Sequence, residues 1–80
     1  MTHPNDVVNE VNEVFAEYKS AAEKFPAFNS GHEGWAVIKE ELDELWMEVR
    51  LFPYGNKENM KKEAKQVAAM ALRFMVDCCR

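Results

Sequence analysis

Apolar residues recur with the period of an α-helix along most of the chain, and prolines interrupt the pattern at two places. Pro26 ends the first segment, because a proline disfavours helical geometry in the residue before it. Pro53, Gly55 and Asn56 are typical turn residues and separate the second segment from the third. The sequence therefore predicts an all-α chain of three helices in a single domain, residues 1–80.

The first two helices have recognisable start signals. Asn5 or Asp6 is a plausible N-cap for the first helix. Ser30 followed by Glu33 has the spacing of a capping box, which starts a second helix that runs to about Arg50. One face of the first helix carries the apolar residues, which are Val7, Val8, Val11, Val14, Phe15, Tyr18, Ala21, Ala22 and Phe25.

The third helix is predicted from about Lys57 to the C-terminus. From Val67 onward it reads VAAMALRFMVDCC, in which only Arg73 and Asp77 are charged. A helix that is apolar nearly all round needs cover on more than one side. We expect part of that cover to come from outside the chain, and we interpret Asp77 as a surface acid at the helix end.

The length of the chain also favours self-association. A domain of 80 residues buries only about 60 to 65% of the surface that its unfolded form exposes, so a lone monomer is marginally stable. Yet 48% of the residues are hydrophobic, which is more than a disordered segment carries. We therefore expect an oligomeric helical bundle, either a homodimer or a homotetramer.

Charge and targeting signals narrow the class of partner. The formal net charge is −4, which argues against binding to a nucleic acid polymer or an anionic membrane and favours cations as partners. No apolar run reaches the roughly 20 residues that span a bilayer, and the start MTHPND does not resemble a signal peptide. The adjacent Cys78 and Cys79 are expected to be reduced thiols that pack against the bundle. These features favour a soluble, cytoplasmic protein.

The second helix carries an unusual concentration of acids beside its apolar face. A step of about 100° per residue gives an apolar arc of Trp35, Ile38, Leu42, Leu45, Trp46 and Val49, next to an acidic arc of Glu33, Glu40, Glu41, Glu44 and Glu48. Like charges four residues apart each destabilise a helix by roughly 0.2 to 0.5 kcal/mol. Either the acids form a solvated stripe partly matched by lysines, or they bind a hard cation.

The cation interpretation requires the second and third helices to pair. If a short turn joins them in antiparallel fashion, Glu41 and Glu44 lie near the level of Glu63 to Gln66. Glutamates without His or Cys favour Mg²⁺ or Mn²⁺ over Zn²⁺.

Two motifs resemble a known family. The run EELDE at 40–44, with KKEAKQVAAMALRF at 61–74 and the stretch FNSGHEGWAVIKEELDELW, is similar to the MazG-like nucleoside triphosphate pyrophosphohydrolases of the all-alpha NTP pyrophosphatase superfamily. The signature of that family is EExxE, a spacer and ExxD, and the resemblance covers residues 25–78. It implies that Glu41, Glu44 and Glu63 are Mg²⁺ ligands, with Glu40 as a further ligand or as the group that orients the attacking water. Gln66 stands where the family has an aspartate.

The resemblance also implies a reaction, the hydrolysis of an NTP or dNTP to a nucleoside monophosphate and pyrophosphate. Candidate substrate contacts are His32, Lys57, Lys61, Lys62, Lys65 and Arg73. The cations are alternatively solvated, and His32 alternatively completes the first turn of its helix. Aromatic residues that could stack on a base, or belong to the core, are Phe28, Trp35 and Trp46.

Two other functions are compatible with the same sequence. A non-catalytic regulatory or assembly module could retain the bundle and lose turnover together with the aspartate. A partner-binding module could use the apolar third helix to fill a groove on another protein. Mg²⁺-dependent stabilisation and a stable homo-oligomer distinguish the enzyme from these alternatives.

Overall fold

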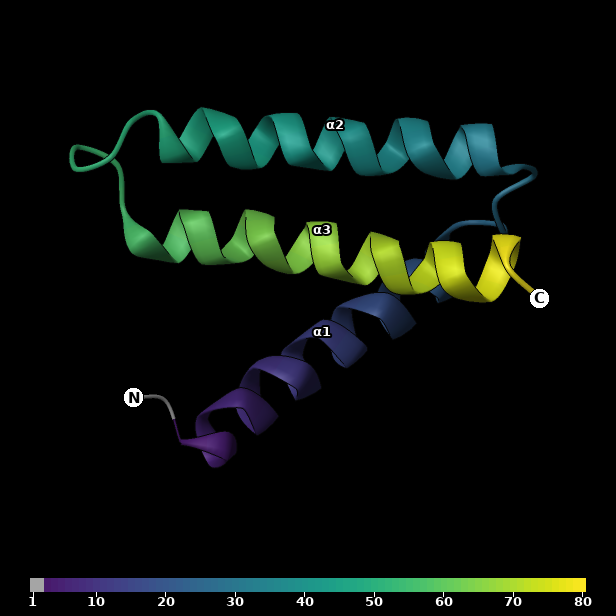
Figure 1. The fold of residues 1–80 in the computed structure, drawn as a ribbon, viewed down its shortest axis with the longest axis horizontal. Helices are drawn as coiled ribbons and strands as arrows, with labels where there is room; N and C mark the ends of the chain where they lie inside the picture. The colour runs from purple at the N-terminus through teal and green to yellow at the C-terminus, as the bar shows by residue number, and fades with distance from the viewer. Residues whose placement is uncertain (1–2) are drawn as a thin grey trace.

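Three helices account for most of the chain in the computed structural model, which describes residues 3–80. They are α1 (Pro4–Lys24), α2 (Gly31–Val49) and α3 (Lys57–Cys78). Helices α2 and α3 lie antiparallel along their whole lengths, whereas α1 crosses α3 and diverges from it toward the N-terminus (Figure 1). Helix α3 packs against both neighbours, and the all-α prediction with three helices is confirmed.

The first helix begins earlier than predicted. Its N-cap is His3, whose Nδ1 accepts a hydrogen bond from the Asn5 backbone N–H at 3.1 Å. The Asp6 carboxylate in turn accepts from the His3 backbone N–H at 3.2 Å, which completes a capping box. The prediction of Asn5 or Asp6 as the N-cap is wrong, because Pro4 has no N–H to satisfy and suits the first helical position.

The other two helix starts agree with the sequence. The Ser30 hydroxyl accepts from the Glu33 backbone N–H at 3.1 Å, as the predicted capping box requires. The Glu33 carboxylate differs from that prediction, because it accepts from the backbone and side-chain nitrogens of Asn29 at 3.2 and 3.0 Å instead of from Ser30. The Asn56 side chain caps α3 by accepting from the Asn59 N–H at 2.7 Å.

The core is small and lies around the C-terminal half of α3. Its buried residues are Ala21, Phe28, Ala69 and Met70, with Val14, Tyr18, Val37, Ile38, Phe74 and Cys78 packed against them. Gly34 brings α2 close to this core, since a Cβ at that position would lie 2.7 Å from Phe74 Cδ2 and 3.0 Å from Phe28 Cδ2. A residue without a side chain is therefore needed where α2 approaches α3.

Two charged residues of α3 hold the linker between α1 and α2. Arg73 is 5% exposed, donates from Nη2 to the Pro26 carbonyl at 2.9 Å, and places its guanidinium 4.3 Å from the centroid of the Phe28 ring. Asp77 accepts a hydrogen bond from the Phe28 backbone N–H at 3.1 Å. The interpretation of Arg73 as a solvated cation is therefore wrong, because the linker folds back over α3. Asp77, interpreted as a surface acid at the helix end, is half-buried and bonded to the linker.

Large apolar side chains remain exposed on α1 and α2. Trp35 and Trp46 are 61% and 59% exposed, so the core alternative is wrong for both tryptophans, whereas Phe28 belongs to the core at 8%. The reason is that α3 covers only one stripe of α2, and the tryptophans lie outside it. Within residues 3–80, no helix has the length and hydropathy that a membrane span needs.

Candidate metal centre

Three glutamates meet between α2 and α3. Glu41, Glu44 and Glu63 each present a carboxylate oxygen, and these oxygens lie within 4.8 Å of one another. Glu41 and Glu44 are three residues apart on α2 and therefore share a face. The antiparallel pairing of α2 with α3 brings Glu63 to the same level. The prediction that the two parts of the motif meet is confirmed.

Burial and like charge make this cluster electrostatically unfavourable without a cation. Burial raises the pKa of Glu41 to about 7, and the charge and hydrogen bond of Glu44 and the charges of Glu63 and Glu40 act in the same direction. The pKa of Glu63 is raised by burial and by Glu44, with Lys62 opposing the shift. A divalent cation would reverse the sign of the local field and favour the ionised carboxylates.

The donor set suits a hard cation. Mg²⁺ prefers six oxygen ligands at about 2.0 to 2.1 Å and usually keeps several waters. Three carboxylates would leave positions for water or for the oxygens of a phosphate. Glu40 lies outside this group on the exposed side of α2, and its influence on the site is the effect of its charge on Glu41.

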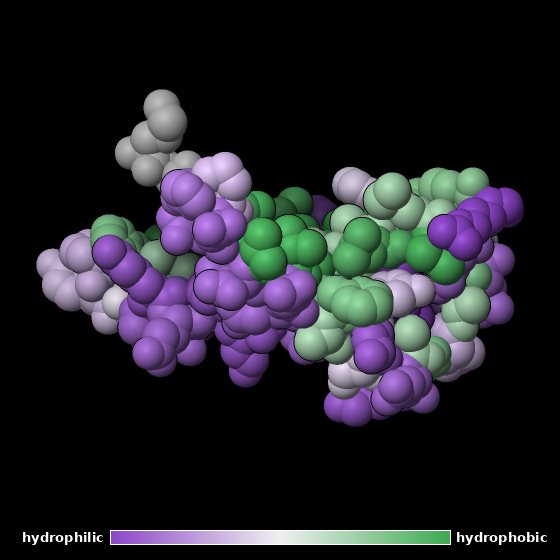
Figure 2. Space-filling view, turned by 90° about the horizontal axis from the view of Figure 1, so that it is seen from below, coloured by the Kyte–Doolittle hydropathy of each residue, from purple (hydrophilic) through white to green (hydrophobic). Residues whose placement is uncertain are grey.

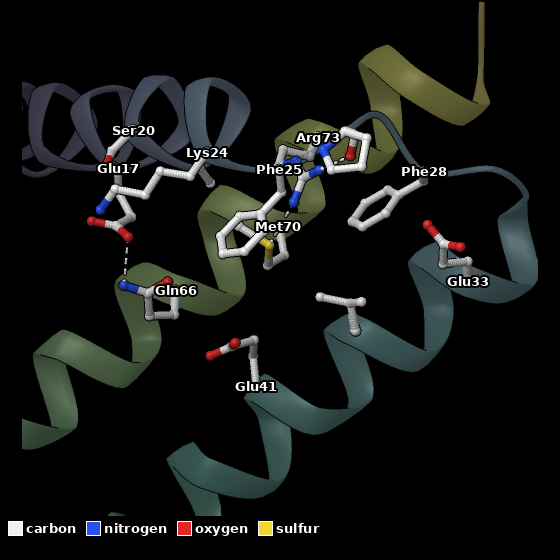
Figure 3. A pocket seen from close by; sticks show the side chains of 13 residues that line it. Glu17, Ser20, Lys24, Phe25, Phe28, Glu33, Glu41, Gln66, Met70 and Arg73 are labelled. Carbon is white, nitrogen blue, oxygen red and sulfur yellow. Dashed lines mark hydrogen bonds between the residues drawn. The ribbon is translucent and has the colours of Figure 1, made fainter.

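Gln66 lies beside the cluster and is tied to α1. Its Nε2 donates to Glu17 Oε1 at 2.7 Å, as the dashed line in Figure 3 marks. The amide that replaces the expected aspartate thus makes its hydrogen bond with a carboxylate of the first helix. Its Oε1 is still able to accept a bond or ligate, but it brings no negative charge.

A cavity of about 470 Å³ adjoins the carboxylates. Figure 3 shows that its walls come from all three helices and the linker, with Glu41 on the wall formed by α2. The lining residues are Glu17, Ser20, Ala21, Lys24, Phe25, Pro26, Phe28, Glu33, Val37, Glu41, Gln66, Met70 and Arg73. Because Glu41 belongs to both features, a molecule in this cavity would lie next to the carboxylate cluster.

The predicted cationic contacts do not gather around the cluster. Lys61 forms ion pairs with Glu10 and Glu13 of α1, at 3.0 and 2.9 Å. Lys61 and Lys65 both line a groove of about 160 Å³ between α1 and α3. Lys62 is close enough to Glu63 to affect the pKa of that carboxyl group. His32 is exposed at the start of α2 and does not line the cavity.

Several cavity residues were not predicted as site residues. From α1 they are Glu17, Ser20 and Lys24, and no local motif singles them out. Arg73 was predicted either as a substrate contact or as a solvated cation, and it lines the cavity as a buried residue. A lone arginine in an apolar run is itself a signal, because a buried charge requires partners. The contribution of α1 could not be found in the same way, since it depends on how that helix crosses α3.

Comparison with protein-family models, with curated protein sequences and with solved structures finds no match for this chain. The MazG-like assignment therefore stays a prediction from the sequence motifs.

Proposed function

We propose that this chain is a Mg²⁺-dependent nucleoside triphosphate pyrophosphohydrolase of the MazG-like type. The observation that carries the proposal is the convergence of Glu41, Glu44 and Glu63, each with one carboxylate oxygen within 4.8 Å of the others. These are the residues to which the EExxE motif and the following helix assign metal ligation. The elevated pKa of Glu41, caused by burial and by its acidic neighbours, supports a site that a cation would stabilise.

The proposed reaction is attack of water on an NTP or dNTP between the α and β phosphates, which releases a monophosphate and pyrophosphate. Bound Mg²⁺ or Mn²⁺ would neutralise the triphosphate and activate the water. Glu41, Glu44 and Glu63 would hold the metal, and Glu40 would contribute charge or orient water. The adjoining cavity, which is partly walled by Phe25 and Phe28, has room for a nucleoside.

The proposal extends to assembly, because the chain exposes many large apolar side chains, among them Trp35, Trp46 and Val11. A homodimer or homotetramer would cover part of this surface.

The test is pyrophosphate release from a panel of canonical and modified ribo- and deoxyribonucleoside triphosphates, with Mg²⁺ or Mn²⁺. Glu41→Gln and Glu44→Gln are each expected to reduce the rate by about 100-fold or more, because each removes a charged ligand. Asp43→Asn is the matched control. Asp43 belongs to the same run but is exposed and pairs with Lys39 at 2.6 Å, so its loss should leave the rate nearly unchanged.

A second candidate is a non-catalytic helical regulatory or assembly module. The hydrogen bond from Gln66 to Glu17 favours it, because the position that should supply a fourth acidic ligand is instead committed to holding α1. Absence of pyrophosphate release with either metal, together with no effect of Mg²⁺ on the melting temperature, would contradict the enzyme and support this module.

A further inference from the structure

One acid of α1 differs from the other acids along that helix. The side of the molecule on which α1 lies carries hydrophilic groups over a large part of its surface (Figure 2). Glu10 and Glu13 form ion pairs with Lys61 at 3.0 and 2.9 Å, and Glu23 is exposed. Glu17 is half-buried and lines the cavity beside the carboxylate cluster. Glu17 therefore belongs to the surroundings of the candidate metal centre.

The Glu17 carboxylate is held by a neutral group of α3. Its Oε1 accepts a hydrogen bond from Gln66 Nε2 at 2.7 Å (Figure 3). Within residues 3–80 the ion pairs are those of Lys39 and Lys61, and neither lysine pairs with Glu17. The negative charge of Glu17 thus has no basic side chain in direct contact with it, although the carboxylate is half-buried.

Gln66 explains why this carboxylate lies where it does. The position carries an amide where the EExxE and ExxD signature has an aspartate, so α2 and α3 supply three carboxylates to the cluster. An amide brings no negative charge, but its N–H donates, and here it donates to an acid of another helix. The chain has lost an acid on α3 at this position and holds an acid of α1 beside it.

Glu33 is also an acid of the cavity wall outside the cluster, but its carboxylate is engaged elsewhere. Its two oxygens accept hydrogen bonds from the backbone and side-chain nitrogens of Asn29, at 3.2 and 3.0 Å. Figure 3 shows Glu33 beside the linker, on the opposite side of the site from Glu17 and Gln66. Glu17 therefore combines two properties that Glu33 does not share, a place on the cavity wall and a bond to the motif.

We propose that Glu17 is the fourth acid of the metal centre and supplies from α1 the negative charge that Gln66 lacks. This proposal rests on the proposed function, because it requires a cation at Glu41, Glu44 and Glu63. Glu17 is not among the carboxylates whose oxygens lie within 4.8 Å of one another, so it acts from outside the ligand set. Groups in such positions change metal affinity by about 10- to 100-fold when they are replaced.

The experiment measures Mn²⁺ binding to the full chain through the loss of the electron paramagnetic resonance signal of the free ion, since carboxylate sites for Mg²⁺ also suit Mn²⁺. Glu17→Gln should weaken binding by about 10-fold. The new amide oxygen can still accept the hydrogen bond from Gln66, so the variant removes the charge and keeps the contact between α1 and α3. A purely structural role of Glu17 would leave Mn²⁺ binding in this variant unchanged.

Two further variants control for net charge. Glu23→Gln removes the same charge from an exposed position of the same helix and should leave Mn²⁺ binding unchanged. The double variant Glu17→Gln/Gln66→Asp has the net charge of the wild type and returns the acid to α3, so it should recover most of the lost affinity. Circular dichroism verifies that each variant keeps its helicity.

The outcomes separate this proposal from the proposed function. Wild-type affinity in Glu17→Gln, with weaker binding in Glu41→Gln, would overturn the role of Glu17 and support the metal centre. Equal losses in Glu17→Gln and Glu23→Gln would also overturn it, because net charge alone would then explain the effect. A wild type that binds no Mn²⁺ would contradict the metal centre itself and, with it, both proposals.

Discussion

Helices α1 and α2 both pack against α3, but they are held in different ways. Helix α2 lies along the whole of α3, approaches it closely at Gly34, and shares the carboxylate cluster with it. Helix α1 contributes Val14, Tyr18 and Ala21 to the core, while its N-terminal half diverges and keeps its valines exposed (Figure 1).

The two helices differ in the sequence separation of the contacts that position them. The pairing of α2 with α3 follows a short connecting turn and includes a close approach at Gly34. The position of α1 depends on contacts distant in sequence, namely those of Arg73 and Asp77 with the linker and the Gln66 bond to Glu17. We therefore expect the α2–α3 pair to be the more robust unit and α1 the more easily displaced.

The largest effect on stability is expected from Arg73→Ala. The change removes the bond to the Pro26 carbonyl and the stacking on Phe28, and it leaves a cavity. The free energy of unfolding should fall by about 3 kcal/mol, as measured by urea denaturation at fixed protein concentration. Arg50→Ala, at an exposed position, should change it little.

Hydrogen exchange adds a regional test of the same substitution. Relative to the wild type, Arg73→Ala should accelerate amide exchange much more in α1 than in α2. The reason is that the lost contact joins α3 to the linker at the end of α1. Equal acceleration in both helices would contradict the comparison.

The glycine pair on α2 tests close packing directly. Gly34→Ala should lower the free energy of unfolding by about 1 to 2 kcal/mol, because the new Cβ would meet the Phe74 and Phe28 rings. Gly31→Ala is the control, since its Cβ would lie 3.8 Å from Phe74 and has room. That variant should be as stable as the wild type or slightly more so, because alanine is the better helix former. Equal loss in both variants would show that backbone conformation, not space, sets the effect.

The pH dependence of stability tests the carboxylate cluster between α2 and α3. The pKa of Glu41 is raised from 4.5 to about 7 by burial and by its acidic neighbours, so the folded chain binds this proton more tightly than the unfolded chain does. Stability should therefore be greatest below pH 4.5 as far as this group is concerned, and fall as the pH rises through about 7.

Thermal melts over this pH range measure the effect. Glu41→Gln should reduce the slope of stability with pH, and Mg²⁺ should raise the melting temperature more above pH 7 than below it, because a metal binds the ionised carboxylates. A slope that is the same in Glu41→Gln and the wild type would assign the dependence to another group.

The smallest effect is expected from Lys61→Ala. Its ion pairs with Glu10 and Glu13 join α1 to α3, but all three side chains are substantially exposed, so solvent and salt screen them. The urea midpoint should move only slightly at low salt and not measurably at high salt. A large, salt-independent loss would mean that these pairs, and not the linker contacts, position α1.

Much of the α2–α3 part could be predicted from residues close in sequence. Ser30 and Asn56 start the helices, and the turn after Arg50 makes them antiparallel. Helical geometry then fixes the meeting of Glu41 and Glu44 with Glu63. Residue spacing cannot predict the position of a helix that is held by contacts with residues more than 40 positions away. The hydrogen bond between Gln66 and Glu17 is such a contact.

The exposure of the tryptophans marks the same limit. Amphipathic spacing identifies which residues share an arc of α2, but it does not say which part of that arc α3 covers. The structure buries the stripe that includes Gly34 and leaves Trp35 and Trp46 in solvent.

The sequence by itself determined three helices, the Ser30 cap of α2 and the level at which the acids of α2 face Glu63, because these follow from local hydrogen bonding and a fixed rise per residue. Only the tertiary structure decided the path of α1, the burial of Arg73 and the cavity beside Glu41. Those features depend on how side chains distant in sequence fill space around α3, and periodicity carries no information about that packing.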